Sequence, residues 1–194
     1  MSSVPPFAAV VLAGGRAARL GGQQKPQLDV GGRSMLSTVL TALDGAAPRV
    51  VVGPPQPVPT GVRLVREQPP GGGPVPALAA GLAEVGDVEV VAVLAADLPF
   101  VTAELVTALR ERLTGDGVLV VDDTGRDQLL LGVWRTAVLR TAISGARPHS
   151  PLRALFAPLA VRRYRPAAIP GVPAPWTDCD TPAELARARS LAGG

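Results

Sequence analysis

The segment Phe7-Ala8-Ala9-Val10-Val11-Leu12 is a continuous apolar run that stops at the glycines Gly14 and Gly15. A run of this kind is typical of a strand in a parallel sheet, because helices cover both faces of such a sheet and bury both faces of each strand. The segment therefore predicts an α/β protein whose sheet begins with this strand.

Helical and strand-like patterns alternate along the rest of the chain. Helices are predicted over residues 34–43, 77–84, 102–113, 136–143 and from a capping box at Thr181–Glu184 to about Leu191. Strands are predicted over 49–52, 62–65, 88–95, 118–121, 129–134 and 159–164, with 88–95 at the centre and a hairpin turn at 122–125. The order predicts one domain over 1–194, a three-layer α/β sandwich with a mostly parallel sheet and an antiparallel edge strand.

The composition excludes several functional classes. The 194 residues include 22 glycines and 21 prolines, are 47% hydrophobic and carry a net charge of +3, which indicates a loop-rich globular protein with no dense basic patch. We therefore expect no nucleic-acid or membrane partner. With one cysteine, Cys179, and one histidine, His149, the chain cannot form an internal disulfide or a Cys/His zinc site. It also shows no signal core or membrane span, so we expect a cytoplasmic protein.

The loop after the first strand indicates a phosphate site. Glycines let backbone N–H groups approach phosphates, and Arg16, Arg19 and Lys25 add positive charge. Lys25 is the only lysine in the chain. The loop fits neither GxGxxG nor the P-loop, since Pro26 follows the lysine. The alternative, a glycine-rich connection with solvated arginines, explains the glycines but not the position of the lysine.

Three acids are candidates for a second part of the site. Asp97 follows the predicted central strand, at the sheet edge where ligands of α/β proteins bind, and a carboxylate there suits Mg²⁺ facing phosphates. The alternative is an aspartate that accepts hydrogen bonds from turn N–H groups. Asp178 and Asp180, before the last helix, either reach the same crevice or simply favour the helix dipole.

These motifs resemble those of the molybdenum cofactor guanylyltransferases, a family of Rossmann-like nucleotidyltransferases. The first loop, from Leu12 through Lys25, is similar to the signature loop of that family. Gly72-Gly73-Pro74 is similar to its second loop, Ala95-Ala96-Asp97-Leu98-Pro99 to its metal-binding turn, and Asp178–Leu185 to its closing motif. The motifs occur in the family's order over nearly the whole chain.

The resemblance implies that GTP, with Mg²⁺, reacts with Mo-molybdopterin to give the guanine dinucleotide cofactor and pyrophosphate, with apo-molybdoenzymes or their chaperones as later partners. It implies that Lys25, Arg19 and Asp97 are catalytic and that Asp97 holds the metal. Substrate-binding positions carried over from the family are Leu12, Ala13, Gly14, Gly15, Arg16, Lys25, Gln68, Asp97, Asp178 and Asp180. The ionised terminal phosphate of the pterin would attack the α-phosphorus in line, so no general base is required.

Three positions depart from the family pattern. Gln24 precedes the lysine where aspartate is common, Gly53 stands where asparagine often follows the second strand, and Glu67-Gln68 replaces an acid pair. The last two bear on guanine recognition. Two alternatives therefore stay open: a related transferase that uses CTP or another acceptor, such as a sugar phosphate or small phosphorylated acid, and a non-catalytic GTP-binding adaptor.

Overall fold

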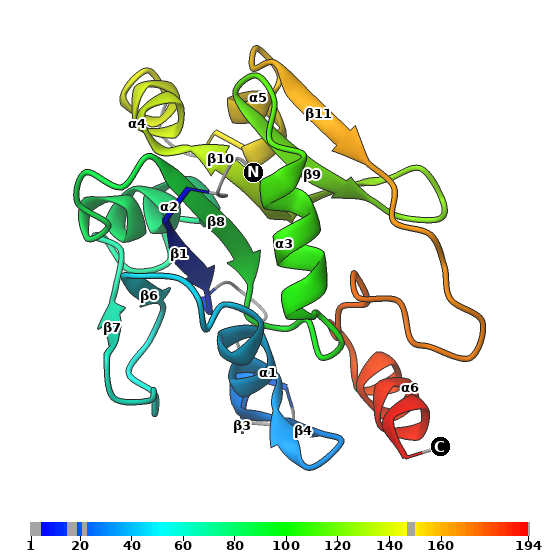
Figure 1. Ribbon diagram of the computed structural model, residues 1–194. Coiled ribbons are helices and arrows are strands. Elements are labelled where there is room, and N and C mark those ends of the chain that lie inside the picture. Colours follow the sequence, from blue (N-terminus) through cyan, green and yellow to red (C-terminus); the bar gives the residue numbers. More distant parts are fainter. Residues whose placement is uncertain (1–4, 15–18, 21–22, 147–149, 194) are drawn as a thin grey trace.

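The computed structural model describes residues 5–14, 19–20, 23–146 and 150–193. A seven-stranded sheet runs through the molecule in the order β11-β9-β10-β8-β1-β6-β7 (Figure 1). Its strands are β1 (Phe7–Leu12), β6 (Arg49–Val52), β7 (Val62–Val65), β8 (Val90–Ala95), β9 (Gly117–Val121), β10 (Asp127–Arg135) and β11 (Val161–Tyr164). Within this sheet β10 runs antiparallel to both its neighbours, and the other pairings are parallel.

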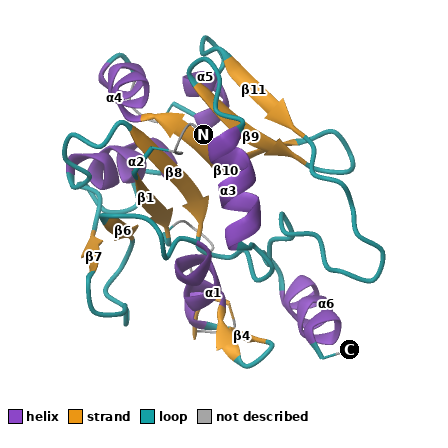
Figure 2. Cartoon of the chain, viewed as in Figure 1, coloured by secondary structure: helices purple, strands orange, loops and turns teal. Residues whose placement is uncertain are grey.

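The expected α/β fold with a mostly parallel sheet is confirmed, and the antiparallel strand lies third from the β11 edge. The helices are α1 (Met35–Ala42), α2 (Pro74–Ala83), α3 (Ala103–Glu111), α4 (Thr136–Ser144), α5 (Leu152–Phe156) and α6 (Pro182–Ala192). Figure 2 shows their alternation with the strands. Short elements are β2 (Arg19–Leu20), β3 (Gln23–Gln24), the 3₁₀ turn η1 (Lys25–Gln27), β4 (Asp29–Val30) and β5 (Arg33–Ser34).

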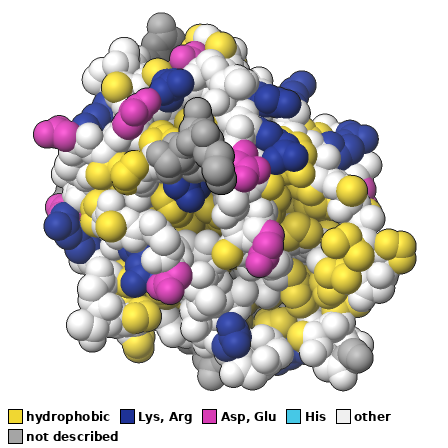
Figure 3. All heavy atoms as spheres, viewed as in Figure 1, with side chains coloured by type: hydrophobic (Ala, Val, Ile, Leu, Met, Phe, Trp, Pro, Cys, Tyr) yellow, Lys and Arg dark blue, Asp and Glu magenta, His cyan; other side chains and the backbone are white. Residues whose placement is uncertain are grey.

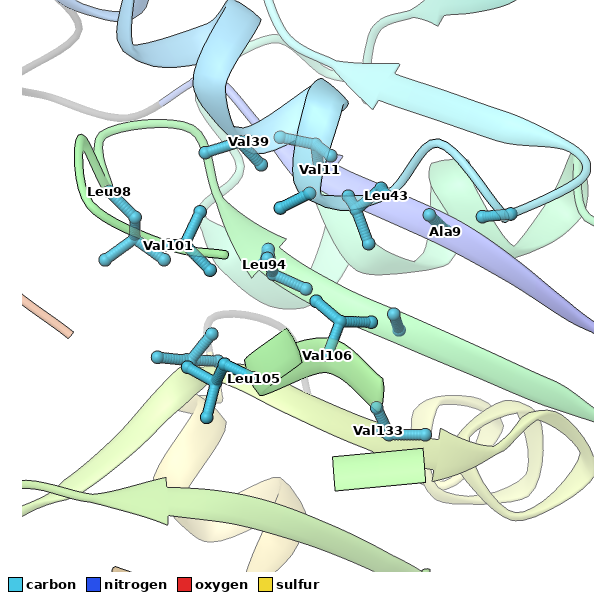
Figure 4. Packing of buried hydrophobic residues seen from close by; sticks show 14 of the residues in the cluster. Ala9, Val11, Val39, Leu43, Leu94, Leu98, Val101, Leu105, Val106 and Val133 are labelled. Carbon is cyan, nitrogen blue, oxygen red and sulfur yellow. The ribbon is translucent and has the colours of Figure 1, made fainter. Parts of the chain in front are cut away.

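Alternation along the strands divides the core into two layers. Ala9 and Val11 of β1 face a cluster that includes residues of α1 and α3, while Ala8 and Val10 face one that includes residues of α2, α4 and α5. Figure 4 shows the first layer, with Val39 of α1 and Leu94 of β8 among the labelled side chains. Since both faces of β1 are buried, its uninterrupted apolar sequence has a direct physical cause.

The helix starts agree with capping chemistry, with one shift. The hydroxyl of Thr181 accepts from the backbone N–H of Glu184, which completes the predicted capping box of α6. Helix α2 begins at Pro74, earlier than the predicted start at 77, because proline is favoured at the first helical position and Gly73 supplies the N-cap with a φ of 96°. Helix α5 was not predicted, since it is only five residues long.

The segment between β11 and α6 carries exposed apolar side chains, and hydrophobic side chains gather on this side of the molecule in Figure 3. Ile169 and Val172 are 63% and 57% exposed. Further along, Trp176 is buried against the first core layer, and Cys179 packs with Leu185 of α6 in a third, smaller cluster. None of the helices in the described ranges is long and apolar enough to cross a membrane.

Candidate active site

The site is built at the carboxyl ends of β1 and β8, which lie side by side in the sheet. Leu12 pairs with Ala95, and the backbone N–H of Ala96 donates to the carbonyl of Leu12 at 3.0 Å. The N–H of Ala13 donates to Val52 of β6 at 2.7 Å. Both predicted motifs, the first loop and the Asp97 turn, therefore start from one sheet edge, as expected for parallel strands.

Gly53, after β6, lets the first loop pass close to the sheet. A Cβ at this position would lie 2.9 Å from both the carbonyl carbon and the oxygen of Ala13, which are backbone atoms that cannot yield cheaply. Asparagine, which the family resemblance expects here, therefore has no room while Ala13 keeps this position. The observed path of the Leu12–Gly14 backbone therefore requires glycine at position 53.

Lys25 lies between two carboxylates from distant parts of the chain. Its Nζ donates to Oδ2 of Asp97 and to Oδ1 of Asp180, each at 2.5 Å. The side chain of Lys25 is 6% exposed, compared with 20% for Asp97 and 60% for Asp180. The only lysine of the chain thus joins the first loop, the Asp97 turn and the closing motif at one point.

The charges around this point shift three pKa values. Burial lowers the pKa of the Lys25 ammonium, but Asp97 and Asp180 outweigh it, so the pKa lies above its ordinary value and the side chain is cationic at neutral pH. Burial and the negative charges of Asp180 and Asp97 raise the pKa of Asp178. Burial, followed by the charge of Asp97, raises the pKa of the Cys179 thiol to about 11, which leaves it protonated and unreactive.

A pocket of about 710 Å³ opens on one side of Asp97. It is walled by backbone and apolar side chains, with Glu67 as a buried acid: its Oε1 accepts from the N–H of Gly71 at 2.9 Å and so holds the glycine loop. Its lining comprises Leu12, Gly14, Glu67, Gly71, Gly72, Gly73, Pro74, Ala77, Ala95, Asp97, Leu129, Leu130, Ser150, Pro151 and Leu152. We call it the glycine pocket.

A second pocket, of about 590 Å³, opens on the other side of Asp97 and is rich in carboxylates. Trp176 and Thr177 of the long connection contribute to its wall, together with Arg126 and Gln128 of the β9–β10 hairpin. Its acids are Asp97, Asp122, Asp127, Asp178, Asp180 and Glu184. We call it the acidic pocket, and it shares Ala95, Asp97, Leu129, Leu130 and Leu152 with the glycine pocket.

The predicted hairpin turn positions one polar side chain of the acidic pocket. Oδ1 of Asp122 accepts from the N–H and hydroxyl of Thr124 and from the N–H of Arg126, and its Oδ2 accepts from Nε2 of Gln128 at 2.9 Å. The hydroxyl of Thr124, followed by the N–H of Arg126, lowers the pKa of Asp122. Asp122 is thus an ionised anchor that orients Gln128, a residue that the sequence did not single out.

A bulge in β10 forms the wall between the two pockets. Gln128 pairs with Val120 of β9, and Gly132 pairs with the adjacent Leu119, so residues 129–131 are extra on β10. Leu129 and Leu130 are half-buried and line both pockets. In the sequence these leucines indicated only an apolar strand, because a bulge depends on pairing with a strand that the sequence does not specify.

The acids at this point fit a magnesium ion, although within the described ranges His, Cys, Asp and Glu form no metal-type cluster of three. Mg²⁺ in phosphate-transfer sites takes one or two carboxylates and completes its shell with phosphate oxygens and water. The Asp97 and Asp180 oxygens already converge on one cation, the Lys25 ammonium. Carboxylate oxygens that converge on one cation in this way are suitable ligands for Mg²⁺.

The structure brings most, but not all, of the predicted site residues together. Leu12, Gly14, Asp97, Asp178 and Asp180 line one or both pockets. Gln68 is exposed and lines neither, whereas its neighbour Glu67 faces the glycine pocket. Arg19 lies in β2, paired with Gln24 of β3.

Two further predicted residues, Gly15 and Arg16, fall outside the part of the chain that the structure describes. Ala13 is buried at the base of the loop, where its N–H is engaged with Val52.

Comparison with known proteins identifies relatives over most of the chain. Residues 9–165 match the family model of the MobA-like NTP transferase domain. A Mycobacterium tuberculosis protein described as a probable molybdenum cofactor guanylyltransferase is 37% identical over 139 residues, covering 68% of this chain and 69% of the relative.

Solved structures share the fold at lower identity. Molybdopterin-guanine dinucleotide biosynthesis protein A from Archaeoglobus fulgidus has a TM-score of 0.67 and 19% identity over 96% of this chain and 98% of its own. The 2-C-methyl-D-erythritol 4-phosphate cytidylyltransferase from Thermus thermophilus has a TM-score of 0.69 and 20% identity over 97% and 100%. The fold is therefore that of a nucleotidyltransferase and does not by itself select the base or the acceptor.

Proposed function

Since this chain belongs to the MobA-like NTP transferase family and is a nucleotidyltransferase, we propose that it transfers GMP from GTP to the terminal phosphate of Mo-molybdopterin, releasing pyrophosphate. The observation that carries this proposal is the meeting of two pockets at Asp97, with Lys25 beside it. A transfer between two large substrates requires two adjacent sites with a common cationic centre. The names of the relatives supply the base and the acceptor.

We assign GTP to the glycine pocket. Pro74 and Pro76 remove two N–H donors from the first turn of α2, so the start of this helix suits a base or ribose better than a phosphate chain. The triphosphate would then extend toward the loop after β1 and Lys25, where the ammonium and the predicted Arg19 neutralise it. Glu67 lines this pocket and Gln68 does not, so we assign to Glu67 the recognition of the base, whose N–H groups would donate to its carboxylate.

We assign the pterin to the acidic pocket. A pterin carries N–H and NH₂ donors on its pyrimidine ring, and carboxylates and the Gln128 amide oxygen are acceptors for such groups. The phosphate of the acceptor is repelled by the same acids and attracted by the ammonium of Lys25, which lies beside Asp97. That geometry directs the nucleophilic oxygen to the junction of the pockets.

Asp97 and Asp180 are the residues that would hold Mg²⁺. When bound, the ion supplies charge neutralisation and orientation of phosphate oxygens. Lys25 supplies a compact positive charge to the phosphates, and Leu129 and Leu130 exclude water at the junction of the pockets. The nucleophilic phosphate is ionised at neutral pH, which agrees with the absence of an assigned general base among these residues.

Partners and location follow from this assignment. The product is a cofactor, so apo-molybdoenzymes or their chaperones are its proposed recipients. The donor GTP is a cytoplasmic nucleotide, and we place the reaction in the cytoplasm.

The experiment that tests the proposed function is pyrophosphate release from GTP, CTP, ATP and UTP, each with Mg²⁺ and with or without Mo-molybdopterin. Release from GTP that requires the pterin supports the proposal. Release from another nucleotide identifies a related transferase, and binding of GTP without any release identifies an adaptor.

A further inference from the structure

The Lys25 ammonium occupies the place between two carboxylates where a divalent cation is expected. Its Nζ lies 2.5 Å from both Asp97 and Asp180. The two acids come from the turn after β8 and from the segment before α6, so only the folded chain brings them to one cation. One of the two negative charges of this pair is therefore balanced from within the protein.

Displacing this ammonium is unfavourable unless it receives new partners. Its side chain is 6% exposed, so water reaches it poorly, and a buried cation that loses its carboxylates is strongly destabilised. A divalent ion arriving alone would compete with Lys25 for both acids. A triphosphate arriving at the same point offers the ammonium new oxygen acceptors and the metal new ligands.

We propose that Lys25 is a resident cation that keeps Asp97 and Asp180 from binding a free divalent ion, so that metal enters the site together with a triphosphate. This inference rests on the proposed function only in requiring that the site binds a metal and a triphosphate. In this proposal Lys25 determines that the metal does not bind before the triphosphate, in addition to binding phosphate itself. It also protects an acid-rich pocket from metal ions in the absence of substrate.

The chain offers a direct probe, because Lys25 is its only lysine. Protein labelled with carbon-13 at lysine Cε gives a single lysine signal in NMR, and bound Mn²⁺ broadens the signals of nearby nuclei. Three samples are titrated with Mn²⁺: protein alone, protein with inorganic triphosphate and protein with GTP. We expect broadening with either phosphate at Mn²⁺ concentrations about tenfold lower than with protein alone.

A pair of variants tests the same inference by a second readout. Lys25→Met keeps the length of the side chain and removes the charge, and Arg126→Met removes one charge from the wall of the acidic pocket. Electron paramagnetic resonance of free Mn²⁺ measures binding without phosphate. We expect Lys25→Met to bind Mn²⁺ about tenfold more tightly than the wild type, and Arg126→Met to differ from it by less than about threefold.

Two outcomes would overturn the inference: equal broadening with and without triphosphate, or unchanged Mn²⁺ affinity in Lys25→Met. If Lys25→Met does not fold, the NMR titration of the wild type decides alone. Failure of guanylyl transfer with a clear triphosphate dependence of Mn²⁺ binding would reject the proposed function and retain this inference, since inorganic triphosphate carries no base.

Discussion

The two pockets that meet at Asp97 are built in different ways. The glycine pocket is shaped by backbone, with Gly53 and the loop held by Glu67 setting how closely the chain approaches the sheet. The acidic pocket is shaped by side chains, with Asp122 orienting Gln128 and carboxylates around the rim. Under the proposed assignment, the donor site would recognise its substrate by shape and the acceptor site by hydrogen bonding and charge. Asp97 lines both pockets, and Lys25 contacts it.

The largest effect is expected from removing what the pockets share. Lys25→Ala and Asp97→Ala should each lower turnover by about 10²–10³-fold, as removal of a preorganised charge does, while circular dichroism shows a folded chain. Near-normal turnover in either variant would reject the common centre. Lys25→Arg should also be strongly impaired, because a planar guanidinium does not replace a compact ammonium, and full activity would contradict that role.

A smaller effect should separate the donor site from the acceptor site. Gly53→Ala places a Cβ 2.9 Å from the backbone of Ala13, so the first loop must shift. Overpacking of this kind costs about 1–3 kcal/mol, and we expect KM for the nucleotide to rise about tenfold with KM for the pterin unchanged. Gly45→Ala is the matched control, since its nearest contact is an ordinary 3.7 Å to Phe7. If Gly53→Ala raised the KM values for the nucleotide and the pterin equally, the proposed separation of donor and acceptor sites would be wrong.

The reverse separation is expected at the acidic pocket. Gln128→Ala removes a side chain that lines this pocket and is held by Asp122 at 2.9 Å. Loss of about one hydrogen bond to the acceptor should raise KM for the pterin about fivefold and leave KM for the nucleotide unchanged. Steady-state kinetics with each substrate varied in turn measures both. A rise in KM for the nucleotide alone would reverse the assignment of the pockets.

The smallest effect concerns stability. The pKa of Asp178 is raised in the folded state by burial and by Asp180 and Asp97, so its ionisation disfavours folding as pH rises through that pKa. Asp178→Asn should therefore raise Tm at pH 7 and leave it unchanged below the ordinary aspartate pKa. The rise should be only about 1 °C, because the carboxyl group is only partly buried and the residue as a whole is exposed to water, which screens its charge. Asp180→Asn, which loses the contact with Lys25, should lower Tm instead. Tm changes of the same sign in both variants would argue against the charge distribution described around Lys25.

The sequence predicted the glycine side of the molecule better than the acidic side. The apolar runs of β1 and β8 are explained by the burial of both faces of these strands, and the solitary lysine lies in contact with Asp97 and Asp180. Prediction failed where the position of a side chain depends on how strands pair or on which of two adjacent residues faces the pocket. Glu67 and Gln68 are adjacent, and only the path of the loop after β7 decides which of them faces the pocket.

The remaining differences have similar causes. The bulge at residues 129–131 depends on the register between β9 and β10, which sequence pattern does not encode. The contact between Lys25 and Asp180 joins residues far apart in sequence, so the sequence suggested only that Asp180 reaches the same crevice.

In the proposed reaction, the α-phosphate of GTP passes across the junction at Asp97 to an acceptor in the adjacent pocket. It is tested most directly with GTP radiolabelled in the α-phosphate, Mg²⁺ and Mo-molybdopterin, followed by separation of the products. We expect the label to be recovered in the pterin dinucleotide, with none in the pyrophosphate. Label that stays in GTP, or that appears only in free GMP, would contradict it.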